Sequence, residues 1–438
     1  MRWAPVALGL AALASLLTGQ SGSIGRPSFL YTAATRYVPT AWNRGGERFP
    51  EGAHLMLVSG GERRDIVPGF FAAADAAVSF DGKRVLFAGK TALVAKWQIW
   101  ETDLAGGAPR RIVTSPDSCI RPLYLPDGRI VYTRFTATGS EIEVAALEGK
   151  PGSKADTLTH APGWYLTADV LRDGRILFES RDELFTTYPD GTGVESLRCD
   201  HGPKRSGGRQ VSSGDVIFVV AGGLARFTPA SAVQEKMTPM NAEVTGPVAE
   251  ETSDRWLVAA RPMTGGLYSI QQTGPDGRGL ENVESPKSVN AVEPVVVASR
   301  VPPREFPSGL VATRTTGNLL CLDAKESKTP MNGTIRSVRV YTKDAAGAAR
   351  LLGQTTVAPD GSFYVEVPAN RPIRMELLDA AGVRLQGEEN WFWMRPSEQR
   401  ICVGCHAGPE RAPENKVPEI LTKILTPVKM TGDQGRAQ

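Results

Sequence analysis

The stretch Val78-Ser79-Phe80-Asp81-Gly82-Lys83-Arg84-Val85-Leu86-Phe87 decides the fold, because similar stretches return at a fixed spacing. Its Asp-Gly pair lies between two runs of β-forming residues, which is the pattern of a tight hairpin. Further Asp-Gly pairs begin at positions 127 and 173 inside similar runs, so the spacing is 46 residues twice. A repeat of about 40 to 50 residues that holds four short strands is typical of a β-propeller blade.

Fainter copies of the hairpin at residues 213–218 and 253–258 bring the count to five blades. The apolar runs 54–58 and 295–298 can together close a sixth blade, so we expect six blades, with five or seven as the alternatives. A β-sandwich is the competing fold, but it gives no reason for a fixed repeat. We therefore predict a mainly β protein with an N-terminal β-propeller over residues 45–300.

A second, smaller β unit is expected behind the propeller. Residues 301–316 are rich in proline and are interpreted as a linker. Strand-like runs follow at 334–342, 351–357, 362–367 and 373–378, and an Asp-Gly pair at 360–361 predicts a hairpin between the middle two. These runs indicate a small immunoglobulin-like β-sandwich over residues 317–387.

The last part of the chain, residues 388–430, contains Cys402-Val403-Gly404-Cys405-His406 and is interpreted as a haem-binding segment. Two cysteines with two residues between them, followed by histidine, fit covalent attachment of a c-type haem. The thiols of Cys402 and Cys405 can reach two vinyl groups, and the imidazole of His406 can bind the iron. A redox disulfide and half of a zinc site are the alternatives, but no second cysteine pair has this spacing. We predict one covalent haem c.

Aromatic side chains precede this motif in the run Trp391-Phe392-Trp393-Met394. Trp391, Trp393 and Met394 are candidates for contact with the haem, and Met394 or Met430 is a candidate for the second axial ligand. The alternative is that this run fills the core of the sandwich. Cys321 is interpreted as a buried apolar residue, with a ligand near the haem as the alternative.

Three connections between expected blades carry metal-binding side chains, and such connections gather at one rim of a propeller. They are Asp117-Ser118-Cys119, Leu158-Thr159-His160 and Cys199-Asp200-His201. Thiolate and imidazole are good ligands, so Cys119, His160, Cys199 and His201 are candidates for an additional metal ion such as zinc. A disulfide between Cys119 and Cys199 and ordinary loop positions are the alternatives.

The N-terminus predicts secretion. Arg2, the apolar run 3–17 and the small residues at 18–23 form the pattern of a signal peptide, which we expect over residues 1–22. An uncleaved anchor is the alternative, although the run is shorter than the roughly 20 residues of a spanning helix. No other segment is long and apolar enough, so we expect no membrane span after cleavage. The expected location is periplasmic or otherwise extracytoplasmic.

The composition excludes one class of partner and sets the number of domains. The chain has 438 residues, of which 41% are hydrophobic, and this is enough for two or three packed domains. The net charge is only +3, and no long basic run is present, so nucleic acid is not expected as a partner.

The segment from Trp391 to Pro396, together with residues 402–410 and placed behind a propeller and a sandwich, resembles the hydrazine synthase alpha subunit family. The resemblance covers the propeller plus middle-domain portion and implies a monohaem c-type relative with other redox subunits or cytochromes as partners. It also implies a haem between middle domain and propeller, a motif histidine turned toward zinc, and a tyrosine four residues later on the iron. Here that position is Glu410, and the chain has no second C-x-x-C-H motif.

Three functions are consistent with these patterns. The first is an extracytoplasmic c-type haem protein that acts in electron transfer as a subunit of a redox complex. The second is a haem enzyme that acts on a small nitrogen or oxygen compound, and the third is a protein-binding propeller with a structural haem. Whether the protein is an enzyme is left open by the sequence. We expect His406 to bind the iron, because the carboxylate of Glu410 is a harder and weaker substitute for tyrosine.

Overall fold

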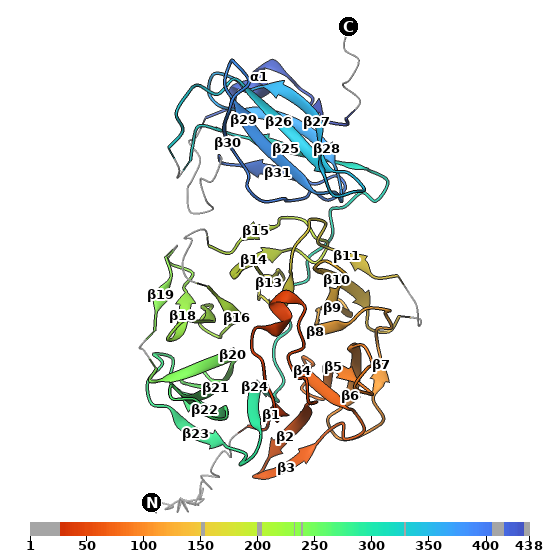
Figure 1. The fold of residues 1–438 in the computed structure, drawn as a ribbon, viewed down its shortest axis with the longest axis vertical. Coiled ribbons are helices and arrows are strands. Elements are labelled where there is room, and N and C mark those ends of the chain that lie inside the picture. The colour runs from red at the N-terminus through yellow and green to blue at the C-terminus, as the bar shows by residue number, and fades with distance from the viewer. Residues whose placement is uncertain are drawn as a thin grey trace, which may run out of the picture.

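Strands form almost all of the regular structure. The computed structural model describes residues 27–149, 154–198, 204–231, 233–237, 240–327, 330–404 and 416–432. Within these residues the strands form eight four-stranded sheets, six in a propeller and two in a following sandwich (Figure 1). The predicted fold class, a six-bladed propeller followed by a small sandwich, is confirmed. The expected signal peptide lies outside the described residues.

Five of the six blades are built from four consecutive strands, and we number them in chain order from blade 1 to blade 5. In each blade the first strand lies nearest the central channel. Blade 1 contains β4 (Ala72–Val78), β5 (Arg84–Lys90), β6 (Gln98–Asp103) and β7 (Arg110–Arg111); blade 2 contains β8 (Cys119–Tyr124), β9 (Arg129–Phe135), β10 (Ser140–Ala146) and β11 (Asp156–Thr157); blade 3 contains β12 (Leu166–Val170), β13 (Ile176–Ser180), β14 (Glu183–Thr187) and β15 (Glu195–Ser196); blade 4 contains β16 (Ser206–Gln210), β17 (Val216–Val220), β18 (Gly223–Phe227) and β19 (Glu235–Lys236); blade 5 contains β20 (Ala242–Thr252), β21 (Arg255–Pro262), β22 (Ser269–Thr273) and β23 (Glu281–Glu284).

The predicted hairpins are present, and the reason is local. The Oδ1 atom of Asp81 accepts a hydrogen bond from the amide of Lys83 at 3.1 Å. The Oδ1 atoms of Asp127 and Asp173 likewise accept from the amide two residues further along the chain. Gly82 follows with φ 74, a left-handed conformation that glycine adopts without a steric penalty. Each Asp-Gly pair therefore folds its own turn, independently of the rest of the chain.

The closing blade joins the two ends of the propeller. Its innermost strand, β24 (Asn290–Val296), pairs with β1 (Phe29–Ala34), which is followed outward by β2 (His54–Ser59) and β3 (Glu62–Asp65). The predicted association of the runs near 54–58 and 295–298 is confirmed, since β2 and β24 lie in one sheet. The sequence did not predict β1, which lies between them.

The innermost strands are bent at the same level in every blade. The pairing of β4, β8, β12, β16 and β20 with the next strand is interrupted by a shift in register. The pairing of β24 with β1 contains such a shift as well. Left-handed residues mark five of the bends, namely Asp75, Arg121, Gly207, Gly246 and Glu293. Such β-bulges re-aim side chains, and those of Asp75, Arg121 and Glu293 line the channel.

The second unit is a sandwich of two sheets around one apolar core. Its strands are ordered β31 (Gln399–Cys402), β25 (Thr316–Cys321), β28 (Phe363–Pro368) and β32 (Val428–Lys429) in one sheet, and β27 (Ala349–Thr356), β26 (Ser337–Lys343), β29 (Ile373–Leu378) and β30 (Arg384–Gly387) in the other. The two short helices are η1 (Ala41–Arg44) in the propeller and α1 (Glu419–Lys423) near the C-terminus. Within the described part of the chain, no helix has the length and apolar character needed to cross a bilayer.

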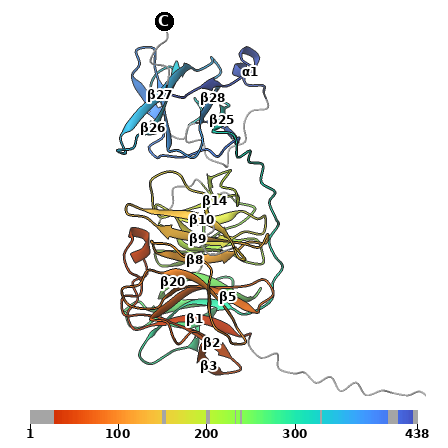
Figure 2. The same ribbon diagram turned by 90° about the vertical axis from the view of Figure 1, so that its right-hand side faces the viewer.

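The proline-rich linker is held along the propeller before it enters the sandwich (Figure 2). The amide of Arg304 donates to the carbonyl of Arg172 at 3.1 Å, and the ring of Phe306 stacks on Tyr188 with a centroid distance of 3.9 Å. Ser308 then donates to the Asp190 carboxylate at 2.9 Å. These contacts hold the linker against blade 3 before the chain reaches the sandwich.

Glycine at the bend of β16 provides a test of the inner-strand geometry. A Cβ atom at Gly207 would lie 2.8 Å from the carbonyl carbon of Gly246 in the next blade, whereas one at Gly128 meets nothing within 4 Å. Both glycines have positive φ. We expect Gly128→Ala to cost about 1 kcal/mol from the backbone conformation and Gly207→Ala to cost roughly 1–3 kcal/mol more from the clash. Urea unfolding measures both, and equal losses would show that blades 4 and 5 do not approach this closely.

Candidate functional site

The first part of the cysteine motif belongs to the sandwich. Strand β31 ends at Cys402, and it runs parallel to β25 with Cys402 opposite Cys321. The carbonyl of Cys402 accepts a hydrogen bond from the amide of Leu322 at 2.9 Å, and the carbonyl of Val403 accepts one from Asp323 at 3.2 Å. The backbone before the second cysteine is therefore fixed by the sheet.

The thiol of Cys402 is half-buried at the edge of the sandwich core and forms no disulfide within the described residues. Burial raises its pKa to about 11. Ile401, its neighbour in the strand, points outward and is 64% exposed. The strand thus presents a thiol and an apolar side chain at the edge of its sheet.

Gly404 sets the direction of the chain between the two cysteines. A Cβ atom at this position would lie 2.5 Å from the carbonyl oxygen of Glu326 and 2.7 Å from that of Asp323. Only glycine fits so close to another backbone segment. Cys405, His406 and Glu410 lie outside the described residues.

The donor set of the motif fits covalent haem. Two thiols separated by two residues and an adjacent imidazole supply two attachment atoms and one iron ligand. The Cys402 thiol, which is not in a disulfide and lies at a sheet edge, agrees with this chemistry. Among the residues that the structure describes, no three His, Cys, Asp or Glu side chains form a group positioned to hold a metal ion.

The aromatic run before the motif crosses from one unit to the other. Met394 is fully buried in the sandwich core together with Met430. Trp393 is instead buried in the apolar cluster between blades 2 and 3, edge-on to Tyr165 at a centroid distance of 5.7 Å. Trp391 packs against the same cluster beneath the guanidinium of Arg374. These side chains, predicted to lie at the haem, fill the two cores and their junction.

Arg395 joins the two units and was given no role by the sequence. Its side chain is buried, and all three of its nitrogens donate hydrogen bonds. Nε donates to the carbonyl of Asp190 at 2.8 Å, and Nη2 pairs with the Asp156 carboxylate at 3.0 Å. Nη1 donates at 3.0 Å to the carbonyl of Thr157 and to the side-chain oxygen of Asn370. One guanidinium therefore holds blade 2, blade 3 and the sandwich together.

His160, a predicted metal ligand, is part of this junction. Its Nε2 atom lies 2.6 Å from Nη1 of Arg395 and accepts a hydrogen bond from it, because a guanidinium only donates. Burial, and then the charge of Arg395, lower the pKa of His160 to about 4. The imidazole is therefore neutral at pH 7, and its acceptor nitrogen is used by Arg395.

Of the other predicted propeller ligands, the structure describes only Cys119, which does not lie at this junction. Cys119 is fully buried in the apolar cluster between blades 1 and 2, and burial raises the pKa of its thiol to about 12. Cys199 and His201 lie outside the described residues. Of the two described candidates, the structure therefore joins His160, and not Cys119, to the segment that precedes the motif.

Comparison with known proteins identifies the second unit. Residues 318–407 match the family model of the hydrazine synthase alpha subunit middle domain. Hydrazine synthase subunit alpha of Kuenenia stuttgartiensis is 36% identical over 61 residues, which cover 14% of this chain and 8% of that protein.

Two solved structures are similar in fold. Kuenenia stuttgartiensis hydrazine synthase matches with a TM-score of 0.80 and 18% identity, over 91% of this chain and 72% of the other. TolB from Acinetobacter baumannii matches with a TM-score of 0.49 and 15% identity, over 62% and 67%. The family model, the segment that is 36% identical and the fold of the hydrazine synthase structure confirm the predicted resemblance to the hydrazine synthase alpha subunit family.

The junction at Arg395 predicts a loss of stability in acid. Folded His160 has a lowered pKa of about 4 against an ordinary value of 6.5, so the unfolded chain binds the proton more tightly. The contribution of neutral His160 to the free energy of unfolding is present above pH 6.5. It is lost as the pH falls toward 4, by at most about 3 kcal/mol. His160→Gln keeps an acceptor for Arg395 but does not titrate, so it should remove this part of the dependence of stability on pH. Urea midpoints between pH 4 and 7 measure it, and an unchanged slope in the variant would contradict the assignment.

Proposed function

We propose that this relative of the hydrazine synthase alpha subunit, with the propeller and middle-domain portion of that family, is a c-type haem protein that transfers electrons. The observation that carries the proposal is the Cys402 thiol at the end of an edge strand, with Gly404 packed so closely that only glycine fits. Cys405 and His406 follow directly in the sequence. The family match extends to residue 407 and so includes the whole motif.

The residues of the motif have separate roles in this proposal. Cys402 and Cys405 each add a thiol across one vinyl group, which forms a thioether without a leaving group. His406 supplies an imidazole to the iron, and the sandwich fixes the backbone on the N-terminal side of the motif. The bound group supplies a one-electron couple.

The position at a sheet edge favours electron transfer. Strand β31 is the outermost strand of its sheet, and Ile401 beside Cys402 is largely exposed. A redox group attached there lies close to the surface, where an apolar contact with a second redox subunit or cytochrome is available. We propose that such a complex forms outside the cytoplasm after cleavage of residues 1–22.

A second candidate function is a haem enzyme that acts on a small nitrogen or oxygen compound. The observation that favours it is the segment 36% identical to hydrazine synthase subunit alpha. The two candidates differ in whether the iron keeps an open coordination position. A zinc ion bound by residues of the motif or of the propeller connections belongs to this second candidate.

Attachment is tested with paired cysteine variants. We expect Cys402→Ala combined with Cys405→Ala to abolish haem staining on a denaturing gel, because both thioethers are lost. Cys321→Ala is the matched control, since Cys321 lies opposite Cys402 in the same sheet. The control should keep one haem per chain by the pyridine haemochrome assay. Equal staining of the double variant would exclude attachment through these two thiols.

Electron transfer is tested by the response to external ligands. We expect a low-spin spectrum that cyanide and nitric oxide leave unchanged, because an electron carrier needs no open coordination position on its iron. His406→Ala should shift the Soret band strongly and Glu410→Ala only slightly. A high-spin spectrum that responds to cyanide would favour the enzyme, and a larger shift in Glu410→Ala would favour the ligand arrangement implied by the family.

A further inference from the structure

The channel of the propeller contains a small cavity, lined by both charged and apolar residues, that is separate from the cysteine motif. Its volume is about 80 Å³, and its lining includes residues of the innermost strands of all six blades. Pro39, Thr40 and Asn43, in and beside helix η1, line it at one end. A wider pocket, lined by residues 298–301 at the start of the linker, lies at the other mouth and shares Arg209 with the cavity. Another wider pocket, at the η1 end, shares Thr40, Asn43 and Ser206 with the cavity.

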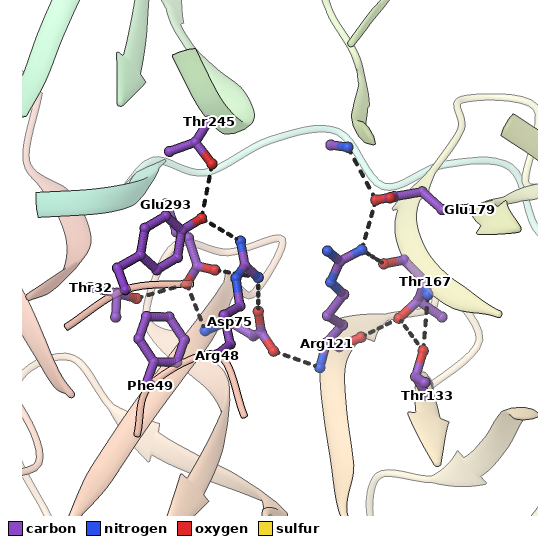
Figure 3. A network of polar contacts seen from close by, with 12 residues as sticks. Thr32, Arg48, Phe49, Asp75, Arg121, Thr133, Thr167, Glu179, Thr245 and Glu293 are labelled. Carbon is purple, nitrogen blue, oxygen red and sulfur yellow. Dashed lines mark hydrogen bonds and ion pairs between the residues drawn. The ribbon is translucent and has the colours of Figure 1, made fainter. Parts of the chain in front are cut away.

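Two charged groups face each other across this cavity (Figure 3). In the first group, Nη1 of Arg48 pairs with Glu293 at 2.7 Å and Nη2 donates to Tyr37 at 2.8 Å, whereas Nε of Arg48 has no hydrogen-bond partner. The other oxygen of Glu293 accepts from the hydroxyl of Thr32 at 2.9 Å. Arg48 and Glu293 are therefore paired mainly with each other.

The second group is incomplete. Nη1 of Arg121 donates to Oε1 of Glu179 at 2.7 Å, and the amide of Gly207 donates to the same oxygen at 3.1 Å. The second oxygen of Glu179 has no hydrogen-bond partner, although the residue is only 3% exposed. Nε of Arg209 is also without one, and it lies 3.8 Å from Asp169.

Such unpartnered charges are costly, and here they coincide with backbone strain. Leaving a buried donor or acceptor unpaired costs about 1–3 kcal/mol, and more for a charged group. Asp75, Arg121 and Glu293 have φ values of 56, 49 and 57, and such left-handed conformations cost roughly 1–2 kcal/mol for residues other than glycine. Strain of this kind persists where surrounding structure imposes it, and it is concentrated at functional sites.

The charge of the lining favours an anion. Three guanidinium groups, those of Arg48, Arg121 and Arg209, line the cavity together with the carboxylates of Glu179, Glu293 and Asp75. Burial, and then the neighbouring charge of Glu293, raise the pKa of Asp75 to about 7, against the opposing effect of Arg48 and Arg121. Burial also raises the pKa of Asp169 beside Arg209. With the carboxyl of Asp75 partly protonated at pH 7, the three guanidiniums are not fully balanced by the carboxylates of the lining.

We propose that this cavity binds a small hydroxycarboxylate, whose carboxylate is held by Arg121 and Arg209 and whose hydroxyl donates to the free oxygen of Glu179. A guanidinium matches the two oxygens of a carboxylate, and the unpaired carboxylate oxygen requires a donor. One ordered water needs roughly 10–15 Å³ on this measure, so the volume suits a ligand the size of glycolate or lactate. The site does not depend on the haem.

Calorimetry on the full chain tests this with four probes, namely lactate, glycolate, acetate and inorganic phosphate. We expect lactate or glycolate to bind one per chain and acetate to bind at least about 10-fold more weakly, because it lacks the hydroxyl that Glu179 accepts. Phosphate or acetate binding as tightly as the hydroxy acids would overturn the assigned class. Absence of binding by all four would show that the channel charges are structural.

Variants separate the site from general stability. Arg209→Gln should weaken the binding of lactate at least 10-fold. The partly exposed side chain of Arg209 has only a distant ion pair to lose. Arg226→Gln is the matched control, because Arg226 lies on strand β18, pairs with Glu235 and does not line the cavity. Glu179→Gln should remove the preference for glycolate over acetate. Equal binding by the Arg209 variant and its control would overturn the site.

Discussion

The buried guanidinium of Arg395 is the interaction on which the relation between propeller and sandwich depends. An arginine remains charged when it is buried, and removing it from water costs several kcal/mol unless its donors are used. Here every nitrogen donates, to carbonyl oxygens of Thr157 and Asp190, to Asn370 and to Asp156. The acceptors belong to two blades and to the sandwich, so the charge is satisfied only when all three parts are in place. The group therefore specifies one arrangement of the two units.

The position of the cysteine motif follows from this junction. Trp393 lies in the propeller core and Met394 in the sandwich core, so the chain crosses between the units at one peptide. Arg395 comes next, and its amide donates to Glu398, whose other oxygen accepts from the amide of Gly193 in blade 3. Strand β31 then begins and carries the chain to Cys402. The segment expected to cover a haem is thus first of all the anchor that directs the motif to the edge of the sandwich.

Closure of the propeller into a ring of six blades is the second constraint on the structure. Because β24 pairs with β1, six innermost strands converge on one channel, and each bends at the same level. The bends place charged residues from blades far apart in the sequence around one small volume. The amide of Arg121, for example, donates a hydrogen bond to Asp75 of blade 1, and its side chain pairs with Glu179 of blade 3. The propeller therefore gathers charged side chains at its centre, while the sandwich places the Cys402 thiol at its edge.

By itself, the sequence determined the features that local interactions create. Asp-Gly turns and alternating strands act within a few residues, so the blades and the sandwich could be predicted. The spacing of Cys402, Cys405 and His406 is local too, and haem attachment there stays a prediction. The tertiary structure alone decided which charged side chains are buried and which partners they meet. Arg395 and His160 are 235 positions apart, and Arg121 and Glu179 are 58 apart. Neither pair has a local signature, because a long-range ion pair or hydrogen bond depends on which strands closure brings together, and that is a property of the whole chain.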